Sequence, residues 1–366
     1  MAFAVLFALA ALDAAGYSII APVVPEIGDA TGAGPGVMGA LVACFAIGQI
    51  VGYPLSARLL QRVRARAVLV ASLSLTIIGD LGFVFGDSLG VYFPARLVQG
   101  IGAGGLWIGT AFAILERYPG EEYKRLSGIL AAYGLGAIAG PAIGGVGGIS
   151  GPFLLHLVLV TALTLALLAI GTPENTAEFG SYRAALRTPG FMLASAGILM
   201  VALTLGTFDG PMPLHFGEQL SQAEIAALYV LTALVSSGAA AFAGRRPPRL
   251  MLAIATVLMT LSIALGGATE VIVVWVLVAL LCGIGVGAGD AGALGVLLES
   301  IGLDRIVLAM VVWSQVWAVG YLIGPAIGGG VAETLGYGAL GLVPLAASAF
   351  VFVGFARLRS EPAASV

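Results

Sequence analysis

Apolar residues fill almost the whole of this chain, and short polar stretches divide them into twelve segments. Each segment has the roughly 20 predominantly apolar residues that a helix needs to cross the hydrocarbon core of a bilayer. The connections are short and leave no room for a soluble domain. The pattern predicts an all-α integral membrane protein with twelve transmembrane helices at 2–24, 37–57, 67–86, 90–115, 125–147, 151–171, 190–214, 222–243, 249–268, 271–298, 305–330 and 337–357.

The composition agrees with this pattern. Hydrophobic residues make up 60% of the chain and charged residues 10%, whereas soluble proteins carry about 25% charged residues. Most of the surface is therefore expected to face lipid. The first segment does not read as a signal peptide, because it lacks a basic start, is too long and contains Asp13.

The placement of charge predicts the orientation. If the N-terminus is cytoplasmic, the inner loops and the C-terminal tail hold 15 of the 16 Lys and Arg residues. The outer loops hold none of them and carry several acids, such as Glu26, Asp87 and Glu333. This is the positive-inside pattern, and it predicts that both termini are cytoplasmic. Short loops favour the cytoplasmic membrane of a prokaryote.

An internal repeat divides the chain into two similar parts. The residues Gly140-Pro141-Ala142-Ile143-Gly144-Gly145 recur 184 residues later as Gly324-Pro325-Ala326-Ile327-Gly328-Gly329. We therefore predict two pseudo-symmetric six-helix halves, 1–171 and 190–366, joined by a cytoplasmic linker at 172–189. Such halves usually bind substrate between them near the midplane. The small residues around each copy, including Gly136, are expected to pack tightly where the halves rock against each other.

Three aspartates inside predicted spans are candidates for binding a proton or a cation. Asp13 lies near the middle of the first span, where an ionised carboxylate costs a few kcal/mol. The carboxyl costs little free energy in the membrane when it is protonated, and it needs a nearby cation when it is ionised. Asp209 lies in the seventh span with two prolines nearby, and Asp290 lies in a glycine-rich part of the tenth span. The alternatives are an acid that only stabilises packing and, for Asp209, one that reaches the outer interface.

Asp80 and Arg96 are expected to lie at the same depth. Counting 1.5 Å per residue from the outer ends of the third and fourth spans puts both roughly 10 Å below the outer surface. At one depth they can form an ion pair, which would lower the cost of each buried charge; a purely structural pair and a role in proton transfer are the two alternatives.

Several stretches resemble the major facilitator superfamily, in particular its twelve-helix drug/proton antiporters and the related vesicular amine transporters. Asp13 with Pro22 and Pro25 is similar to the motif of the first helix, and 96–104, with Arg96, Gln99 and Gly100, to that of the fourth. The glycine and proline pattern at 136–145 is similar to the antiporter motif of the fifth helix. The loop after the second span departs from the family, with Ala57 in place of an aspartate.

The resemblance implies roles for some residues. It implies that Arg96 tunes proton release, and that Gln99, Gly100 and the repeated Gly-Pro segments serve the conformational change. Asp290 resembles an acid in the tenth helix of the vesicular amine transporters.

The function predicted from these features is export of a small lipophilic cation or amine in exchange for protons by alternating access. Four acids inside spans outnumber Arg96, a balance that favours a cationic substrate. Aromatic residues inside spans can attract such a substrate through cation–π contacts. They include Trp107, Tyr133, Tyr229, Trp317 and Tyr321.

The expected partners are a small-molecule organic cation, protons and the lipid bilayer, with no nucleic acid. We predict a monomer that is not an enzyme and needs no cofactor, with the proton gradient as its driving force. Cys44 and Cys282 lie inside spans, and His156 and His215 are isolated in the sequence, so neither a disulfide nor a metal site is expected.

Two alternatives remain open. The first is a proton-coupled transporter of a neutral solute such as a sugar or an amino acid, although the spans contain few Asn and Gln side chains. The second is a membrane scaffold or receptor that does not transport. A scaffold has no need for acids within the membrane.

Overall fold

The computed structural model describes residues 2–169, 189–301 and 306–360. Most of the predicted linker at 172–189 lies outside these residues. All secondary structure that the model describes is helical. The elements are α1 (Ala2–Ser18), η1 (Ala21–Val23), α2 (Val24–Thr31), α3 (Pro35–Leu60), α4 (Ala65–Phe85), α5 (Leu89–Arg117), α6 (Glu122–Gly144), α7 (Ser150–Ala169), α8 (Pro189–Asp209), α9 (Met212–Gly217), α10 (Gln222–Ala243), α11 (Pro248–Gly267), α12 (Ile272–Ile301), α13 (Ile306–Leu335), η4 (Tyr337–Ala339) and α14 (Leu342–Ser360).

The described helices can be compared with the twelve predicted spans. Eleven of the described segments are long and apolar enough to cross a membrane. The remaining predicted span falls on α13, which is 30 residues long. The protein is therefore an all-α multi-pass membrane protein, as the apolar pattern predicts.

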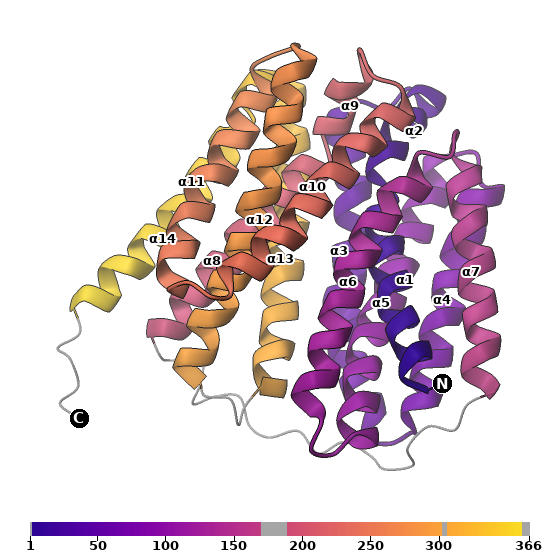
Figure 1. Ribbon diagram of the computed structural model, residues 1–366. Coiled ribbons are helices and arrows are strands. Elements are labelled where there is room, and N and C mark those ends of the chain that lie inside the picture. The colour runs from indigo at the N-terminus through magenta and orange to yellow at the C-terminus, as the bar shows by residue number, and fades with distance from the viewer. Residues whose placement is uncertain (1, 170–188, 302–305, 361–366) are drawn as a thin grey trace.

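Two of the spans are broken near the end of the molecule that carries α2 and α9 (Figure 1). The first consists of α1, η1 and α2 and continues to Thr31, beyond the predicted end at residue 24. Pro22 has no N–H to donate to the preceding turn, which interrupts the helix. The seventh span consists of α8 and α9 and is interrupted in the same way at Pro211.

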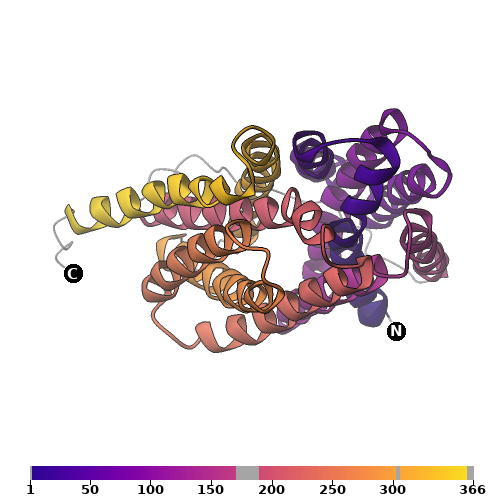
Figure 2. The same ribbon diagram turned by 90° about the horizontal axis from the view of Figure 1, so that it is seen from above.

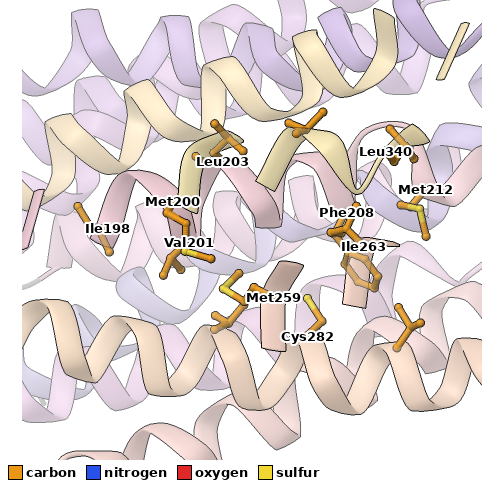
Figure 3. Close-up of a cluster of buried hydrophobic side chains, with 14 of the residues drawn as sticks. Ile198, Met200, Val201, Leu203, Phe208, Met212, Met259, Ile263, Cys282 and Leu340 are labelled. Atoms are coloured by element: carbon orange, nitrogen blue, oxygen red, sulfur yellow. The ribbon is translucent and has the colours of Figure 1, made fainter. Parts of the chain in front are cut away.

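The helices form two bundles that lie side by side, α1–α7 and α8–α14 (Figures 1 and 2). Each bundle has its own hydrophobic core. The core of the second bundle gathers buried side chains of α8, α9, α11 and α12, including Met200, Phe208, Met259 and Cys282 (Figure 3). Its side chains interlock between helices, which stabilises the bundle through van der Waals packing.

The bundles meet near the end of the molecule that carries α2 and α9, opposite the N-terminus (Figure 1). Helix α13 packs along α3, α6 packs along α10, and α2 touches α9. Gly39 is so close to the carbonyl of Pro325 that a Cβ at this glycine would overlap the oxygen atom. Since backbones approach this closely only without side chains, Gly39 is required for the contact between the bundles.

The repeated glycines mostly face a different helix from the one we predicted. Gly136, Gly140 and Gly144 pack against α1 of their own bundle, and their equivalents Gly320, Gly324 and Gly328 pack against α8 of theirs. Only the last glycine of each repeat reaches the other bundle: Gly145 contacts α10 and Gly329 contacts α3. The prediction that the repeated glycines lie between the halves is thus wrong for these six glycines, which recur every four residues on α6 and on α13. A stripe at that spacing occupies one face of a helix, and here this face meets the broken first helix of the same bundle.

The prolines of the repeats and the glycines of α5 also permit close helix contacts. Pro141 is buried in α6, and Pro325 packs against Gly206 of α8 and against Gly210, which directly follows α8. Gly100 meets the carbonyl of Phe45 on α3. The contact of Pro325 holds α13 against α8, and that of Gly100 holds α5 against α3.

Candidate functional site

Arg96 caps the broken end of α1. The last carbonyls of a helix have no partner within the helix, and α1 ends at Ser18. The fully buried guanidinium of Arg96 donates to the carbonyl oxygens of Gly16 (3.2 Å) and Tyr17 (2.9 Å). A cation at this position also complements the negative end of the helix dipole. Arg96 therefore stabilises the break in the first span.

A chain of hydrogen bonds continues from Arg96 to Asp80. Arg96 donates to Oε1 of Gln99 (3.1 Å), and Nε2 of Gln99 donates to Oδ1 of Asp80 (2.7 Å). Arg96 and Asp80 thus do not pair directly: among the described residues, Gln99 stands between the two charges. Arg96 and Asp80 do share one depth, but the guanidinium is drawn toward the free carbonyls of α1 instead of toward α4.

His156 completes this chain. Its Nδ1 lies 2.8 Å from Oδ2 of Asp80, and its Nε2 lies 3.1 Å from the carbonyl oxygen of Leu12. His156 is isolated in the sequence, because its partner lies 76 residues away along the chain. The available signal was a histidine inside an apolar span, where a buried imidazole needs a hydrogen-bond partner.

Asp13 has a tyrosine and a tryptophan beside it. The hydroxyl of Tyr133 on α6 donates to Oδ2 of Asp13. The indole of Trp107 packs edge-on against Tyr133 with ring centroids 4.6 Å apart, and its buried N–H has no hydrogen-bond partner among the described residues. An acid with electron-rich rings nearby is an arrangement that attracts organic cations.

A small cavity adjoins Asp13 and His156. It is lined by α1, α3, α4, α5 and α7 and has room for about one water molecule. It lies wholly inside the first bundle. The cavity is too small for an organic substrate, and both Asp13 and His156 face it.

Asp209 joins the two bundles. It is the last residue of α8, is buried, and accepts hydrogen bonds at Oδ2 from the hydroxyls of Tyr17 (2.8 Å) and Tyr321 (2.9 Å). Tyr17 belongs to α1, in the other bundle. Trp317 stacks on Tyr321 with ring centroids 4.9 Å apart and packs edge-on against Tyr17. This cluster closes the space between the bundles at the level of the helix breaks.

The two networks are continuous. Tyr17 accepts a hydrogen bond from Arg96 through its carbonyl oxygen and donates one to Asp209 through its hydroxyl. A continuous path of hydrogen bonds therefore runs from His156 on α7 to Tyr321 on α13. Within Tyr17 it passes from the backbone carbonyl to the side-chain hydroxyl. Sequence analysis did not single out Tyr17, which lies only four residues after Asp13 on the same helix.

Asp290 lies in the second bundle. It is on α12, which packs against α8, α10 and α11. Its Oδ1 is buried and has no hydrogen-bond partner among the described residues. No described hydrogen bond or ion pair connects Asp290 with Asp13, whose partner is Tyr133.

Comparisons with known proteins agree with the fold. The family model of the Major Facilitator Superfamily matches residues 6–246. A solved POT family transporter in complex with 5-aminolevulinic acid superposes with a TM-score of 0.80, covering 97% of this chain and 95% of that one at 13% identity.

Two curated relatives indicate the kind of protein. Multidrug resistance protein 1 of Bacillus subtilis is 28% identical over 205 residues, which is 53% of each chain. The vesicular acetylcholine transporter of Mus musculus is 28% identical over 182 residues, which is 48% of this chain and 34% of the relative. The chain thus spans about half or less of the length of these relatives.

Proposed function

Because the chain belongs to the Major Facilitator Superfamily and is a membrane transporter, we propose that it exports small lipophilic cations or amines in exchange for protons. The observation that carries this proposal is the surrounding of Asp13. Its carboxyl is held only by the Tyr133 hydroxyl among the described residues, with Trp107 behind that ring. A carboxylate in this setting can bind either a proton or an organic cation, and competition between the two is what an antiporter needs.

The charges within the membrane and the relatives support a cation. Asp13, Asp80, Asp209 and Asp290 all lie inside described spans, as does Arg96, whereas the other Lys and Arg residues of these spans lie within two residues of a span end. The relatives named for multidrug resistance and for acetylcholine transport point to small organic substrates. The solved structures of similar fold carry diverse substrates and are under 25% identical, so they support the fold alone.

We assign the contacts at α2 and α9 to the outer side, following the distribution of Lys and Arg residues. The structure is then closed outside, where Tyr17, Asp209 and Tyr321 join the bundles. In this inward-facing state an ionised Asp13 takes up the cation. The bundles then rock, and protonation of Asp13 from outside releases the cation. The protonated carrier returns and gives its proton to the cytoplasm.

Proton movement in proteoliposomes tests this function. Purified protein is reconstituted with a pH-sensitive dye inside, and lipophilic amines and, separately, sugars and neutral amino acids are added. We expect amines to evoke a proton flux and neutral solutes to evoke none. A flux with neutral solutes alone would overturn the cation assignment.

Removing the Tyr321 hydroxyl is expected to loosen the outer closure. Hydrogen bonds between membrane helices contribute about 0.6 kcal/mol on average, so Tyr321→Phe should raise the outward-open population about threefold. The measurement is the distance between spin labels at positions 29 and 219, whose side chains are exposed on α2 and just beyond α9. Cys44 and Cys282 are replaced beforehand by alanine.

Tyr92→Phe is the matched control. The Tyr92 hydroxyl donates to the carbonyl of Gly86 within the first bundle, away from the contact with the second. It should leave the label distances unchanged. Equal distributions in both variants would show that Tyr321 does not hold the closure.

A further inference from the structure

The pair of His156 and Asp80 is a buried, titratable site that the proposed cycle does not use. The imidazole is 1% exposed and the carboxyl is 0% exposed. The two groups come from α7 and α4 and lie 2.8 Å apart. Asp13 and His156 line the same small cavity, although Asp13 is bonded to a different partner, Tyr133.

The hydrogen-bond partners determine where protons must lie. The carbonyl of Leu12 can only accept, so Nε2 of His156 carries a hydrogen. Arg96 can only donate, so the Gln99 amide is oriented with Oε1 toward Arg96 and Nε2 toward Asp80. Oδ1 of Asp80 therefore accepts.

One contact remains, between Nδ1 of His156 and Oδ2 of Asp80. It needs one proton, either on the nitrogen of an imidazolium facing a carboxylate or on the oxygen of a carboxylic acid facing a neutral ring. Without this proton two lone pairs would face each other at 2.8 Å. In both forms the pair has bound one proton more than a neutral histidine and an ionised aspartate.

We propose that His156 and Asp80 form a second proton-binding site, separate from Asp13 and occupied in this conformation. That its proton takes part in transport rests on the proposed function, whereas the binding of the proton does not. The water-sized cavity gives protons a route between Asp13 and this pair.

The groups around the pair support a bound proton. Helix α7 packs against α4, α1 and α6. These helices present Asp80, Asp13 and, hydrogen-bonded to Asp13, the phenol of Tyr133. Two carboxyls thus favour a protonated imidazole. The opposing charge of Arg96 reaches the pair only through Gln99.

Loss of this proton would change the contacts between His156 and α1. The ring cannot then keep good hydrogen bonds to both Asp80 and Leu12, so one of the two contacts must break. Leu12 directly precedes Asp13, and the ring also packs on Gly16, where a Cβ would lie 2.7 Å from Cε1 of His156. The protonation of the pair is therefore coupled to the helix that carries both Asp13 and Tyr17.

Spectroscopic titration without any substrate tests the proposal. The protein is labelled with nitrogen-15 histidine, placed in lipid nanodiscs and titrated between about pH 5 and about pH 9. Ring-nitrogen signals and the infrared band of protonated carboxyls are recorded together. The chain has two histidines, so comparison with His156→Gln assigns both signals.

We expect one proton to leave the pair, seen either as loss of the second ring N–H of His156 or as loss of a carboxylic acid band. Asp13→Asn should keep this change. Asp80→Asn should remove it, because a buried imidazole without a carboxylate stays neutral. If Asp80→Asn does not fold, His156→Gln must remove the same change.

The proposal is overturned if neither signal changes in the wild type, or if the change persists unaltered in Asp80→Asn. The titration also separates this inference from the proposed function. Absence of amine-driven proton flux would defeat the antiport and leave a positive titration standing. A transporting protein with no titration at the pair would defeat the second site alone.

Discussion

Asp13→Asn is expected to reduce amine-driven proton flux to the level of protein-free liposomes. The amide has the size of the carboxyl and can still accept the hydrogen bond of Tyr133, so the helix contact survives. It can neither ionise to bind a cation nor take up a proton, and the exchange on which antiport depends is lost. The flux assay with the pH-sensitive dye measures the effect.

Two variants complete this test. Asp29→Asn, at an exposed position on α2, removes an acid away from the network and should leave the flux unchanged. Asp13→Glu keeps a titratable group and should retain part of the flux. Uphill amine transport by Asp13→Asn at the wild-type rate would show that the coupling carboxyl lies elsewhere.

Arg96→Leu is expected to lower the stability of the protein by about 3 kcal/mol or more, since hydrogen bonds to charged groups contribute about 1.5–3 kcal/mol each. The guanidinium donates to Gly16, Tyr17 and Gln99 and lies 4.3 Å from the ring centroid of Phe45. Its removal leaves two carbonyls at the end of α1 without a partner. Thermal unfolding in detergent micelles measures the loss.

Arg62→Leu is the control, because Arg62 is exposed at the end of α3. Its melting temperature should stay near that of the wild type. The melting temperature of Arg96→Lys should lie between those of Arg96→Leu and Arg62→Leu. A lysine ammonium can donate to one carbonyl but lacks the planar set of donors of the guanidinium. If Arg96→Leu melts like Arg62→Leu, the capping role of Arg96 is refuted.

Much of the fold follows from local features of the sequence. The spans are visible because each must present roughly 20 apolar residues to lipid. The division into two bundles is visible because the Gly-Pro segment is repeated. The acids within the spans stand out because charged residues are rare among apolar ones.

The sequence does not identify the hydrogen-bond and packing partners of these residues. The spacing along the chain puts Arg96 and Asp80 at one depth, but depth does not say which neighbouring helix a long side chain turns toward. The regularly spaced glycines predict close packing, but they do not identify the helix that packs there, so the neighbour expected for them is wrong.

The sequence by itself determined that this is a membrane protein of twelve apolar helices with acids inside it, because the bilayer imposes length and polarity on each helix separately. Only the tertiary structure decided that His156 meets Asp80, that Arg96 caps α1, and that Asp209 joins the bundles through Tyr17 and Tyr321. Hydrogen bonds within a few ångströms depend on how helices far apart in the chain are packed and rotated. That arrangement results from all the contacts of the bundles together.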